Sequence, residues 1–311
     1  MQPLFDAIAQ ADITPNNRAA KRLFHGRGGL YPGCEHLALD WYPPAWVLTS
    51  FGALAPDTLK ALDEAIVARS AAVGLSTAVC WVYQCRDQGR TETVVMRGTV
   101  PTPHVVTEGN SAFVVHVAKG QNHGLFLDMA NGRQWLRENM MAKPGARVLN
   151  LFAYTCAFSV VAKQAGAAEV VNLDMSDGAL RIGQQNHQLN GCAEGVRFMA
   201  HDLFKSWGKV KRFVPYDTIV ADPPSYQKGS FVATKDYERL LRHLPDLCED
   251  GTDVLLCLNA PELSLSYLQS LVATHAPALS WVGRVENPEA FNDCSSDRAL
   301  KVLHYTFRTR T

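Results

Sequence analysis

Three aspartates stand just beyond predicted strands in the second half of the chain: Asp174, Asp202 and Asp222. In a doubly wound parallel sheet, ligands bind outside the carboxyl ends of the strands. At such a position Asp174 could accept hydrogen bonds from both hydroxyls of a ribose, and Asp202 from an exocyclic amine such as adenine N6. Capping of the next helix is the alternative for Asp174, and an ordinary loop acid is the alternative for Asp202.

The segment Asp222-Pro223-Pro224-Ser225-Tyr226 is the most specific signal in the sequence. Paired prolines fix the backbone and remove two hydrogen-bond donors, so the segment should be rigid. Tyr226 offers a ring on which a planar base can stack. An ordinary turn is the alternative, but two prolines directly after an apolar strand rarely serve only as a turn.

The loop after the first strand of this region, residues 153–157 (AYTCA), contains no glycine. A pyrophosphate needs glycines for close approach of the backbone, so binding of NAD or FAD is disfavoured. The helix that follows still presents free N–H groups that suit a carboxylate. A carboxylate site, an acid for ribose, an acid for adenine and a rigid aromatic loop together indicate S-adenosylmethionine beside a planar methyl acceptor.

Strand and helix patterns alternate beyond about residue 132, which is typical of a parallel sheet covered by helices on both faces. The predicted strands are 147–152, 169–173, 196–200, 216–221, 253–258, 280–285 and 300–306. The predicted helices are 155–165, 176–189, 236–247 and 263–274. This pattern predicts an α/β domain of Rossmann-like architecture over residues 119–311.

The preceding region has a different pattern, with several short strands around one helix. The predicted strands are 46–51, 77–83, 93–97 and 112–117, and the helix covers 55–72 with Asp57 as its N-cap. We therefore predict a small α+β domain over residues 18–118. Residues 1–17 have little periodicity and should form an arm with a short helix.

Composition restricts the class of protein. Of the 311 residues, 47% are hydrophobic and 19% are charged, which is globular composition. The 30 basic and 30 acidic residues cancel, so any nucleic acid must be held by a local patch. Eight scattered cysteines indicate reduced thiols in the cytoplasm, and the absence of CxxC or HxxxH spacing predicts no metal site. No apolar run is long enough for a membrane helix.

The segments 147–191 and 216–226 resemble the class I S-adenosylmethionine-dependent methyltransferases. More narrowly, they resemble the bacterial 23S rRNA group that includes a cytosine-C5 enzyme and a guanine-N7 enzyme. Residues 120–133 (GQNHGLFLDMANGR) resemble the strand and turn before the catalytic domain of that group, usually written G-x-F-L-D with a downstream Arg. Over the N-terminal third, only residues 21–40 resemble the group's small domain. The resemblance implies a seven-stranded sheet and methyl transfer to a base of RNA, with 23S rRNA as the expected substrate.

The resemblance also implies a set of cofactor-binding residues. These are Gln121, Phe126, Asp128, Asn150, Phe152, Tyr154, Thr155, Asp174, Met175, Asp202, Leu203 and Asp222. The chain departs from the group at Cys156-Ala157, where the group usually carries two glycines. It also shows no RNA-binding module of the sort that several members carry.

The cytosine-C5 enzymes attack the base with a cysteine after strand five, where this chain has Asn259. Cys257 lies about 6.6 Å deeper by strand rise, which favours a buried core thiol. We therefore predict direct in-line transfer to a ring or exocyclic nitrogen. Asp222 and the Pro223 carbonyl would orient the acceptor, and Tyr226 would stack on it. Asn259 would hydrogen-bond the edge of the base or, alternatively, cap the next helix.

Two basic clusters are candidate RNA contacts, although solvated surface is the alternative for both. One consists of Lys205, Lys209, Lys211 and Arg212 with Trp207 and Phe213, and the other of Arg18, Lys21, Arg22 and Arg27. Two rival functions stay open. One is a methyltransferase that acts on a small molecule or protein, and the other is a cofactor- or RNA-binding module that has lost catalysis. The sequence does not indicate an oligomeric state.

Overall fold

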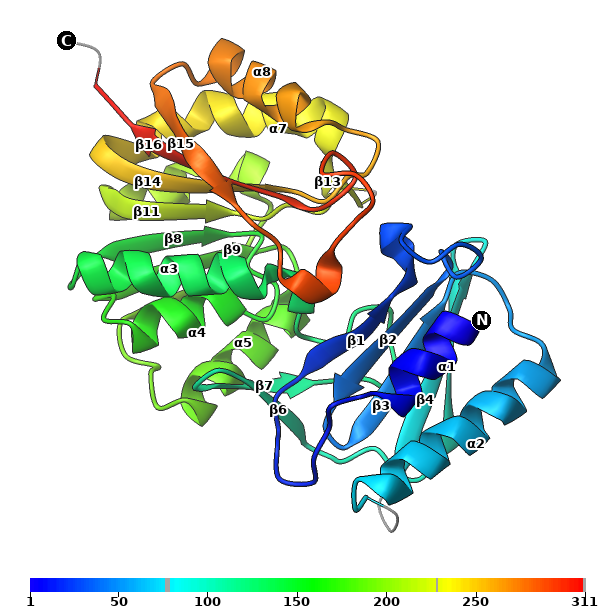
Figure 1. Ribbon diagram of the computed structural model, residues 1–311. Helices are drawn as coiled ribbons and strands as arrows, with labels where there is room; N and C mark the ends of the chain where they lie inside the picture. Colours follow the sequence, from blue (N-terminus) through cyan, green and yellow to red (C-terminus); the bar gives the residue numbers. More distant parts are fainter. Residues whose placement is uncertain (76–78, 228, 310–311) are drawn as a thin grey trace. The chain divides into compact units, whose positions relative to one another are not determined.

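The computed structural model describes residues 1–75, 79–227 and 229–309. It divides into two compact units (Figure 1). The first comprises Met1–Leu127 with Pro288–Cys294, and the second Asp128–Asn287 with Ser295–Thr311. The first unit thus contains both the predicted arm and the predicted small domain, and it continues past residue 118. No helix among the described residues is long and apolar enough to cross a membrane.

The first unit is built on a five-stranded sheet with the order β1-β2-β3-β4-β5, in which β3 and β4 run parallel and the other neighbours antiparallel. Its elements are α1 (Gln2–Ala9), β1 (Lys21–His25), η1 (Gly26–Gly28), β2 (Leu37–Tyr42), β3 (Ala45–Ser50), α2 (Pro56–Ala72), β4 (Cys80–Asp87), β5 (Arg90–Arg97), β6 (His104–Glu108) and β7 (Ser111–Val115). Leu4 and Ile8 of α1 and Leu62 and Ile66 of α2 pack with apolar side chains of one sheet face, so both helices cover that face.

Strands β1, β2 and β6 were not predicted, and the charges in β1 and β2 explain two of these omissions. Arg22 and Asp40 are paired across the register, and Arg22 Nε lies 2.5 Å from Asp40 Oδ1. This partner across the sheet compensates the burial of both charges, which a local pattern does not reveal.

Asp57 is not the N-cap of α2: Ala55 takes that position and Asp57 lies in the first turn. The predicted strand 77–83 begins at Cys80, and its first two residues lie outside the described part of the chain.

The second unit carries a seven-stranded sheet with the order β10-β9-β8-β11-β14-β16-β15. Its strands are β8 (Arg147–Leu151), β9 (Glu169–Asp174), β10 (Val196–Ala200), β11 (Tyr216–Ala221), β14 (Cys248–Leu258), β15 (Leu279–Val285) and β16 (Lys301–Phe307), with a separate hairpin of β12 (Tyr226–Gln227) and β13 (Phe231–Val232). Strand β16 runs antiparallel to both neighbours. The predicted α/β architecture and seven strands are therefore confirmed, and the winding reverses between β8 and β11.

Helices cover both faces of this sheet. They are α3 (Ala130–Ala142), α4 (Ala157–Gln164), α5 (Asp177–Leu189), α6 (Trp207–Val210), α7 (Ala233–His243) and α8 (Leu265–His275). Helix α3 was not predicted, because Asn131-Gly132 near its start reads as a turn. A Cβ on Gly132 would lie 3.4 Å from Phe158 Cζ, so the glycine permits close approach of α3 to α4.

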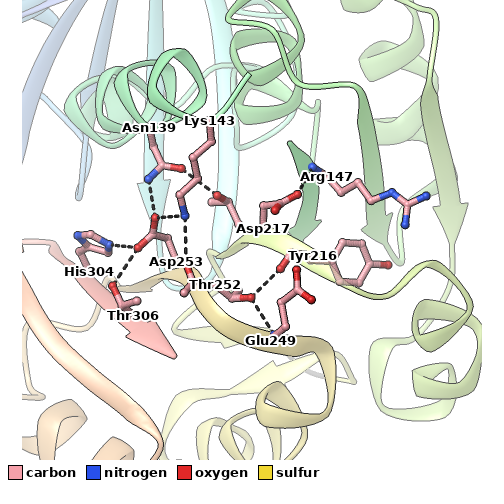
Figure 2. A network of polar contacts seen from close by, with 12 residues as sticks. Asn139, Lys143, Arg147, Tyr216, Asp217, Glu249, Thr252, Asp253, His304 and Thr306 are labelled. Carbon is pink, nitrogen blue, oxygen red and sulfur yellow. Dashed lines mark hydrogen bonds and ion pairs between the residues drawn. The ribbon is translucent and has the colours of Figure 1, made fainter. Parts of the chain in front are cut away.

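A polar network surrounds Asp253 on β14, on the part of the strand away from its carboxyl end (Figure 2). Asp253 Oδ2 accepts hydrogen bonds from Asn139 Nδ2 and Lys143 Nζ, both at 2.7 Å. Its Oδ1 accepts from His304 Nε2 at 2.8 Å and from Thr306 Oγ1 at 3.0 Å. Burial alone would raise the pKa of Asp253, yet the donors His304, Lys143 and Asn139 together hold it well below its usual range. The network joins α3 to two strands and serves the fold.

We expect Asp253→Ala to lower the free energy of unfolding by about 3 kcal/mol at pH 7, because Lys143 and its neighbours lose a buried acceptor. The folded-state pKa lies below the unfolded value of about 3.9. The electrostatic part of this contribution is therefore complete above about pH 4 and is lost as the pH falls toward the folded-state pKa. Denaturant unfolding of both proteins at pH 7 and pH 3 measures the effect.

Asp246→Ala is the matched control. Asp246 also pairs with a lysine, Lys211, at 2.7 Å, but both side chains are about half exposed. Such a surface pair contributes at most about 1 kcal/mol. An equal loss in both variants would contradict the structural role of Asp253.

Candidate active site

The carboxyl ends of β8, β9, β10 and β11 lie next to one another, because these strands are neighbours in the sheet. Asp174 is the last residue of β9, Asp202 lies just beyond β10 and Asp222 directly follows β11. The structure therefore brings the three predicted acids to one edge of the sheet, with the loop after β8 between Asp174 and Asp222.

The loop after β8 has an unusual backbone. Phe152, Tyr154 and Cys156 have φ angles of 58°, 48° and 62°, in the left-handed region that glycine normally occupies. They alternate with residues of ordinary φ, which is the spacing of the glycines in a Gly-x-Gly-x-Gly turn. The loop thus keeps a glycine-like path while presenting side chains, and this strain is typical of a functional site.

Asp174 holds this loop in place. Its Oδ2 accepts the N–H of Tyr154 at 2.8 Å, and its Oδ1 accepts the N–H of Ser176 at 2.8 Å. The N-cap of α5 is Ser176, whose Oγ accepts from the N–H of Ala179. Ser176 therefore caps α5, and Asp174 is not the cap of this helix. Asp174 instead links two loops at the sheet edge.

The loop is also packed tightly against α5. A Cβ on Gly183 would lie 2.5 Å from Cys156 Sγ and 3.0 Å from Cys156 Cβ. Cys156 is fully buried, so its thiol has no room to move away. The cysteine that replaces a glycine of the related group is thus accommodated by a glycine on the facing helix.

We expect Gly183→Ala to destabilise the protein by about 2 kcal/mol, because the added methyl overlaps the Cys156 thiol. The double variant Gly183→Ala/Cys156→Gly should recover most of this loss, since it removes the thiol and relieves the left-handed strain. Gly178→Ala is the control: its Cβ meets only Ser176 Oγ at 3.9 Å, so it should be neutral or stabilising. Thermal and denaturant unfolding of the parent, Gly183→Ala, Cys156→Gly, the double variant and the control provide the measurement, and additive effects of the two single variants would contradict the proposed contact.

A cavity of about 280 Å³ opens beside Asp202. Its lining includes Asp202, Phe204, Lys205, Phe231, Asp236 and Arg239. The rings of Phe204 and Phe231 are 6.2 Å apart and inclined by 19°, and Arg239 Cζ lies 4.1 Å from the centroid of Phe204. Phe204, Phe231 and Arg239 were not predicted as site residues. Phe204 lies two residues after Asp202, whereas Phe231 and Arg239 lie nine and 17 residues after Asp222, so no local spacing pointed to them.

Asp222 occupies a poorly solvated position. Burial and, after it, the nearby carboxylate of Asp128 raise its pKa to about 7, although Arg133 and the Cys257 thiol oppose the change. Cys257 is fully buried, and burial raises the pKa of its thiol well above the usual value. The Tyr237 hydroxyl donates a hydrogen bond to the main-chain carbonyl oxygen of Cys257. The thiol is therefore a core group, as the sequence predicts.

The other predicted catalytic residues surround Asp222 in sequence or follow the neighbouring strand. Pro223 is buried, whereas the Tyr226 side chain is 72% exposed at the start of the β12–β13 hairpin. Asn259 is exposed directly after β14. Helix α8 is capped by Ser264, whose Oγ accepts from the N–H of Tyr267, so the alternative role of Asn259 as that cap is wrong.

Several residues of the predicted cofactor set have other contacts. Asn150 is buried and donates to Asn172 Oδ1 at 2.9 Å, in a polar network that continues to Ser159 and His187. The Leu203 side chain packs in the hydrophobic core. These side chains support the fold of the site.

The remaining members of the set differ in exposure. Met175 is 48% exposed and Thr155 is buried. Phe152 packs edge-to-face against Phe231, with ring centroids 5.2 Å apart. Gln121 and Phe126 belong to the first unit, where both are exposed. Their part in cofactor binding stays a prediction.

The basic cluster near β11 carries less net charge than its sequence suggests. Lys205 pairs with Asp202 at 3.2 Å and Lys211 with Asp246 at 2.7 Å. Lys209 Nζ lies 2.9 Å from His201 Nε2. Carboxylates therefore neutralise two of the four basic side chains in this cluster.

The model of the S-adenosylmethionine-dependent methyltransferase family matches residues 21–307. Ribosomal RNA large subunit methyltransferase I of Aeromonas salmonicida is 37% identical over 160 residues, which cover 48% of this chain and 40% of that protein. Ribosomal RNA large subunit methyltransferase K of Neisseria meningitidis serogroup B is 26% identical over 285 residues, or 87% of this chain and 75% of that protein.

A solved methyltransferase structure from Streptococcus mutans has the same fold. It superposes with a TM-score of 0.79 at 21% identity and covers 98% of this chain and 78% of that one. The match of the family model includes both structural units and the sheet edge with the three acids. The chain therefore belongs to the family of S-adenosylmethionine-dependent methyltransferases.

Proposed function

We propose that this enzyme methylates a base of large-subunit ribosomal RNA, at a ring or exocyclic nitrogen, by direct in-line transfer. The observation that carries the proposal is the Asp222–Tyr226 segment, in which a poorly solvated carboxylate stands next to a rigid proline pair and an exposed aromatic ring. The names of the related rRNA methyltransferases I and K support an RNA acceptor. The eight unpaired cysteines are consistent with a cytoplasmic enzyme.

The residues at the sheet edge fit S-adenosylmethionine. Asp174 has lone pairs left for ribose hydroxyls after it accepts two backbone N–H groups. The cavity beside Asp202 is lined by this acid and by Phe204, which would suit an adenine ring. When bound, the cofactor supplies an electrophilic methyl group on a sulfonium and needs no activation by the protein.

The chain's own contribution is to position the acceptor and exclude water. Asp222 and the carbonyl oxygen of Pro223 would accept hydrogen bonds from the amino or imino edge of the base. Tyr226 would stack on the ring, and Asn259 would hydrogen-bond its edge. Together these contacts would hold the acceptor nitrogen where a bound cofactor would deliver its methyl group.

Transfer of a tritiated methyl group to 23S rRNA that lacks the modification, followed by nucleoside mass spectrometry, tests the proposal. A single labelled nucleoside with the methyl group on nitrogen supports it. A label on carbon would overturn the nitrogen acceptor, and a label only on protein or small molecules would overturn the RNA substrate.

Cys257→Ala distinguishes direct methyl transfer to a nitrogen from a mechanism in which the Cys257 thiol attacks the base. We expect methyl transfer at pH 8 to stay within about twofold of the parent, because a fully buried thiol with a raised pKa cannot attack a base. Initial rates on the same RNA give the comparison. A covalent enzyme–RNA adduct trapped through Cys257, and lost in this variant, would show that the thiol is the nucleophile.

A further inference from the structure

One arginine of the second unit, outside the predicted basic cluster, lies against an aromatic ring of that cluster. Arg197 Cζ is 4.8 Å from the centroid of the Phe213 ring. Arg197 is an exposed residue of β10, the strand at one edge of the seven-stranded sheet. The next side chain, Phe198, packs edge-to-face against His187 of α5. Because successive side chains of a strand point to opposite faces, Arg197 lies on the face away from α5.

The segment between β10 and β11 runs back along β10. All strands from β10 to β11 in the sheet are parallel, so residues 203–213 must return from the end of one strand to the start of another. Phe213 contacts Arg197 near the start of β10, and Lys209 Nζ lies 2.9 Å from His201 Nε2 just beyond its end. Arg197 and His201 are about 13 Å apart by strand rise. The basic side chains of the segment are therefore spread along the strand.

Three of these cations have no carboxylate partner within the described part of the chain. They are Arg197, Lys209 and Arg212, and together with Phe213 we call them the β10 strip. Lysine can only donate a hydrogen bond, so His201 Nε2 is the acceptor in its contact with Lys209 and adds no negative charge. Arg212 is exposed directly before Phe213.

Three acids near the β10 strip are each neutralised by a cation outside it. The pairs are Asp202 with Lys205, Asp246 with Lys211 and Glu169 with Arg147. Glu194, three residues before Arg197, is exposed and makes no ion pair with a described residue. When Glu194 is counted against the three cations, the strip still carries two positive charges.

We propose that the β10 strip binds the phosphate backbone of the RNA substrate. The proposal rests on the proposed RNA methylation and adds a surface that holds the strand. Guanidinium groups offer paired donors that match phosphate oxygens, and the Phe213 ring already restrains Arg197, so less side-chain entropy is lost on binding. A strip of this length can contact more than one phosphate.

One end of the β10 strip adjoins the candidate active site within the same unit. Lys209 contacts His201, and the next residue is Asp202 at the carboxyl edge of the sheet. An RNA strand that lies along β10 would therefore reach the edge at which Asp174, Asp202 and Asp222 meet. The strip itself is not part of that edge, so it should contribute to RNA affinity and not to the transfer step.

Filter binding of unmodified, in vitro transcribed 23S rRNA over a range of KCl concentrations tests the proposal, with S-adenosylhomocysteine present to prevent turnover. Arg197→Gln and Arg212→Gln should each lower the affinity about five- to tenfold near 0.1 M salt and reduce the slope of log K against log salt by about 1. Glu194→Gln removes the unpaired acid beside Arg197 and should raise the affinity. In methyl transfer, both arginine variants should raise KM for RNA and leave kcat at saturating RNA unchanged.

Arg181→Gln is the matched control. It removes one positive charge from α5, on the other face of β10, where Arg181 is 73% exposed and pairs with Asp177. It should change neither affinity nor slope, and a loss equal to that of Arg197→Gln would mean that only net charge matters and would overturn the proposal. Thermal unfolding and calorimetric titration with S-adenosylhomocysteine should be the same in all variants, which shows that they are folded and bind the cofactor product.

The outcomes separate the strip from the proposed function. If the parent methylates RNA but Arg197→Gln and Arg212→Gln keep its salt slope and its KM for RNA, the β10 strip is wrong and the proposed function stands. If the parent neither binds nor methylates RNA, both are wrong. A lower affinity in Glu194→Gln would also contradict a phosphate contact at this end of the strip.

Discussion

Replacing Asp174 with alanine should lower the affinity for S-adenosylmethionine by about 100-fold or more. The carboxylate accepts the N–H groups of Tyr154 and Ser176, both at 2.8 Å, and it is the predicted acceptor for the ribose hydroxyls. Each hydrogen bond to a charged group is worth about 1.5–3 kcal/mol, so loss of the ribose contacts and release of the strained loop should together exceed a hundredfold effect. Calorimetric titration with the cofactor measures the change.

Asp177→Ala provides a matched control in the same turn. Asp177 has a 60% exposed side chain and pairs only at the surface with Arg181, so its loss should leave cofactor affinity within about twofold. Asp174→Asn keeps the shape but replaces one acceptor oxygen by a donor, and it should retain part of the affinity. Unchanged binding by a folded Asp174→Ala protein would exclude the ribose role.

The second unit could be predicted well from the sequence because its strands are short, apolar and separated by clear helix stops. Periodicity gave the strands of the sheet and the edge at which Asp174, Asp202 and Asp222 meet. It failed at α3, where Gly132 reads as a turn but serves close packing against Phe158. A packing reason of this kind depends on the partner helix and is not visible locally.

The first unit could be predicted less well because its strands carry charges whose partners are distant. Arg22 and Asp40 are adjacent only after β1 and β2 have paired. The contact of Arg27 and Arg86 with the Phe51 ring has the same origin, since these residues come from three segments. The basic composition of residues 18–27 made them a candidate RNA contact with solvated surface as the alternative, but only the structure shows that Arg22 is paired with Asp40.

The loop after β8 shows a different limit. The absence of glycine in residues 153–157 disfavoured binding of NAD or FAD, yet the loop has left-handed residues at positions 152, 154 and 156. The compensation is Gly183, which lies on the facing helix and makes room for Cys156. The loop thus keeps the backbone path of a glycine turn without glycines, because Gly183 on α5 leaves room for the Cys156 side chain.

Asp222→Asn should reduce methyl transfer about 100-fold or more at pH 8, measured at saturating cofactor so that a weaker cofactor affinity does not contribute. The amide keeps the volume but loses the negative charge that orients the acceptor, and a small misplacement of the acceptor nitrogen is costly in an in-line reaction. Single-turnover rates on 23S rRNA measure the effect. Asp246→Asn, at an exposed acid of the same unit, should have the parent rate.

The raised pKa of Asp222 also predicts the direction in which the rate of methyl transfer changes with pH. Burial raises the pKa of Asp222 to about 7, so the carboxyl group is mostly neutral below that pH and ionised above it. The ionised carboxylate accepts a hydrogen bond from the base. The value of kcat/KM of the parent for the cofactor should therefore rise about tenfold per pH unit below pH 7 and level off above it, whereas the Asp222→Asn profile should be flat in this range. A sulfonium bound near the carboxylate would favour its ionised form, so the midpoint for kcat should lie lower than that for kcat/KM of the cofactor. A parent rate that falls as the pH rises through 7 would mean that neutral Asp222 donates a proton to the base, and would reverse the role assigned to it.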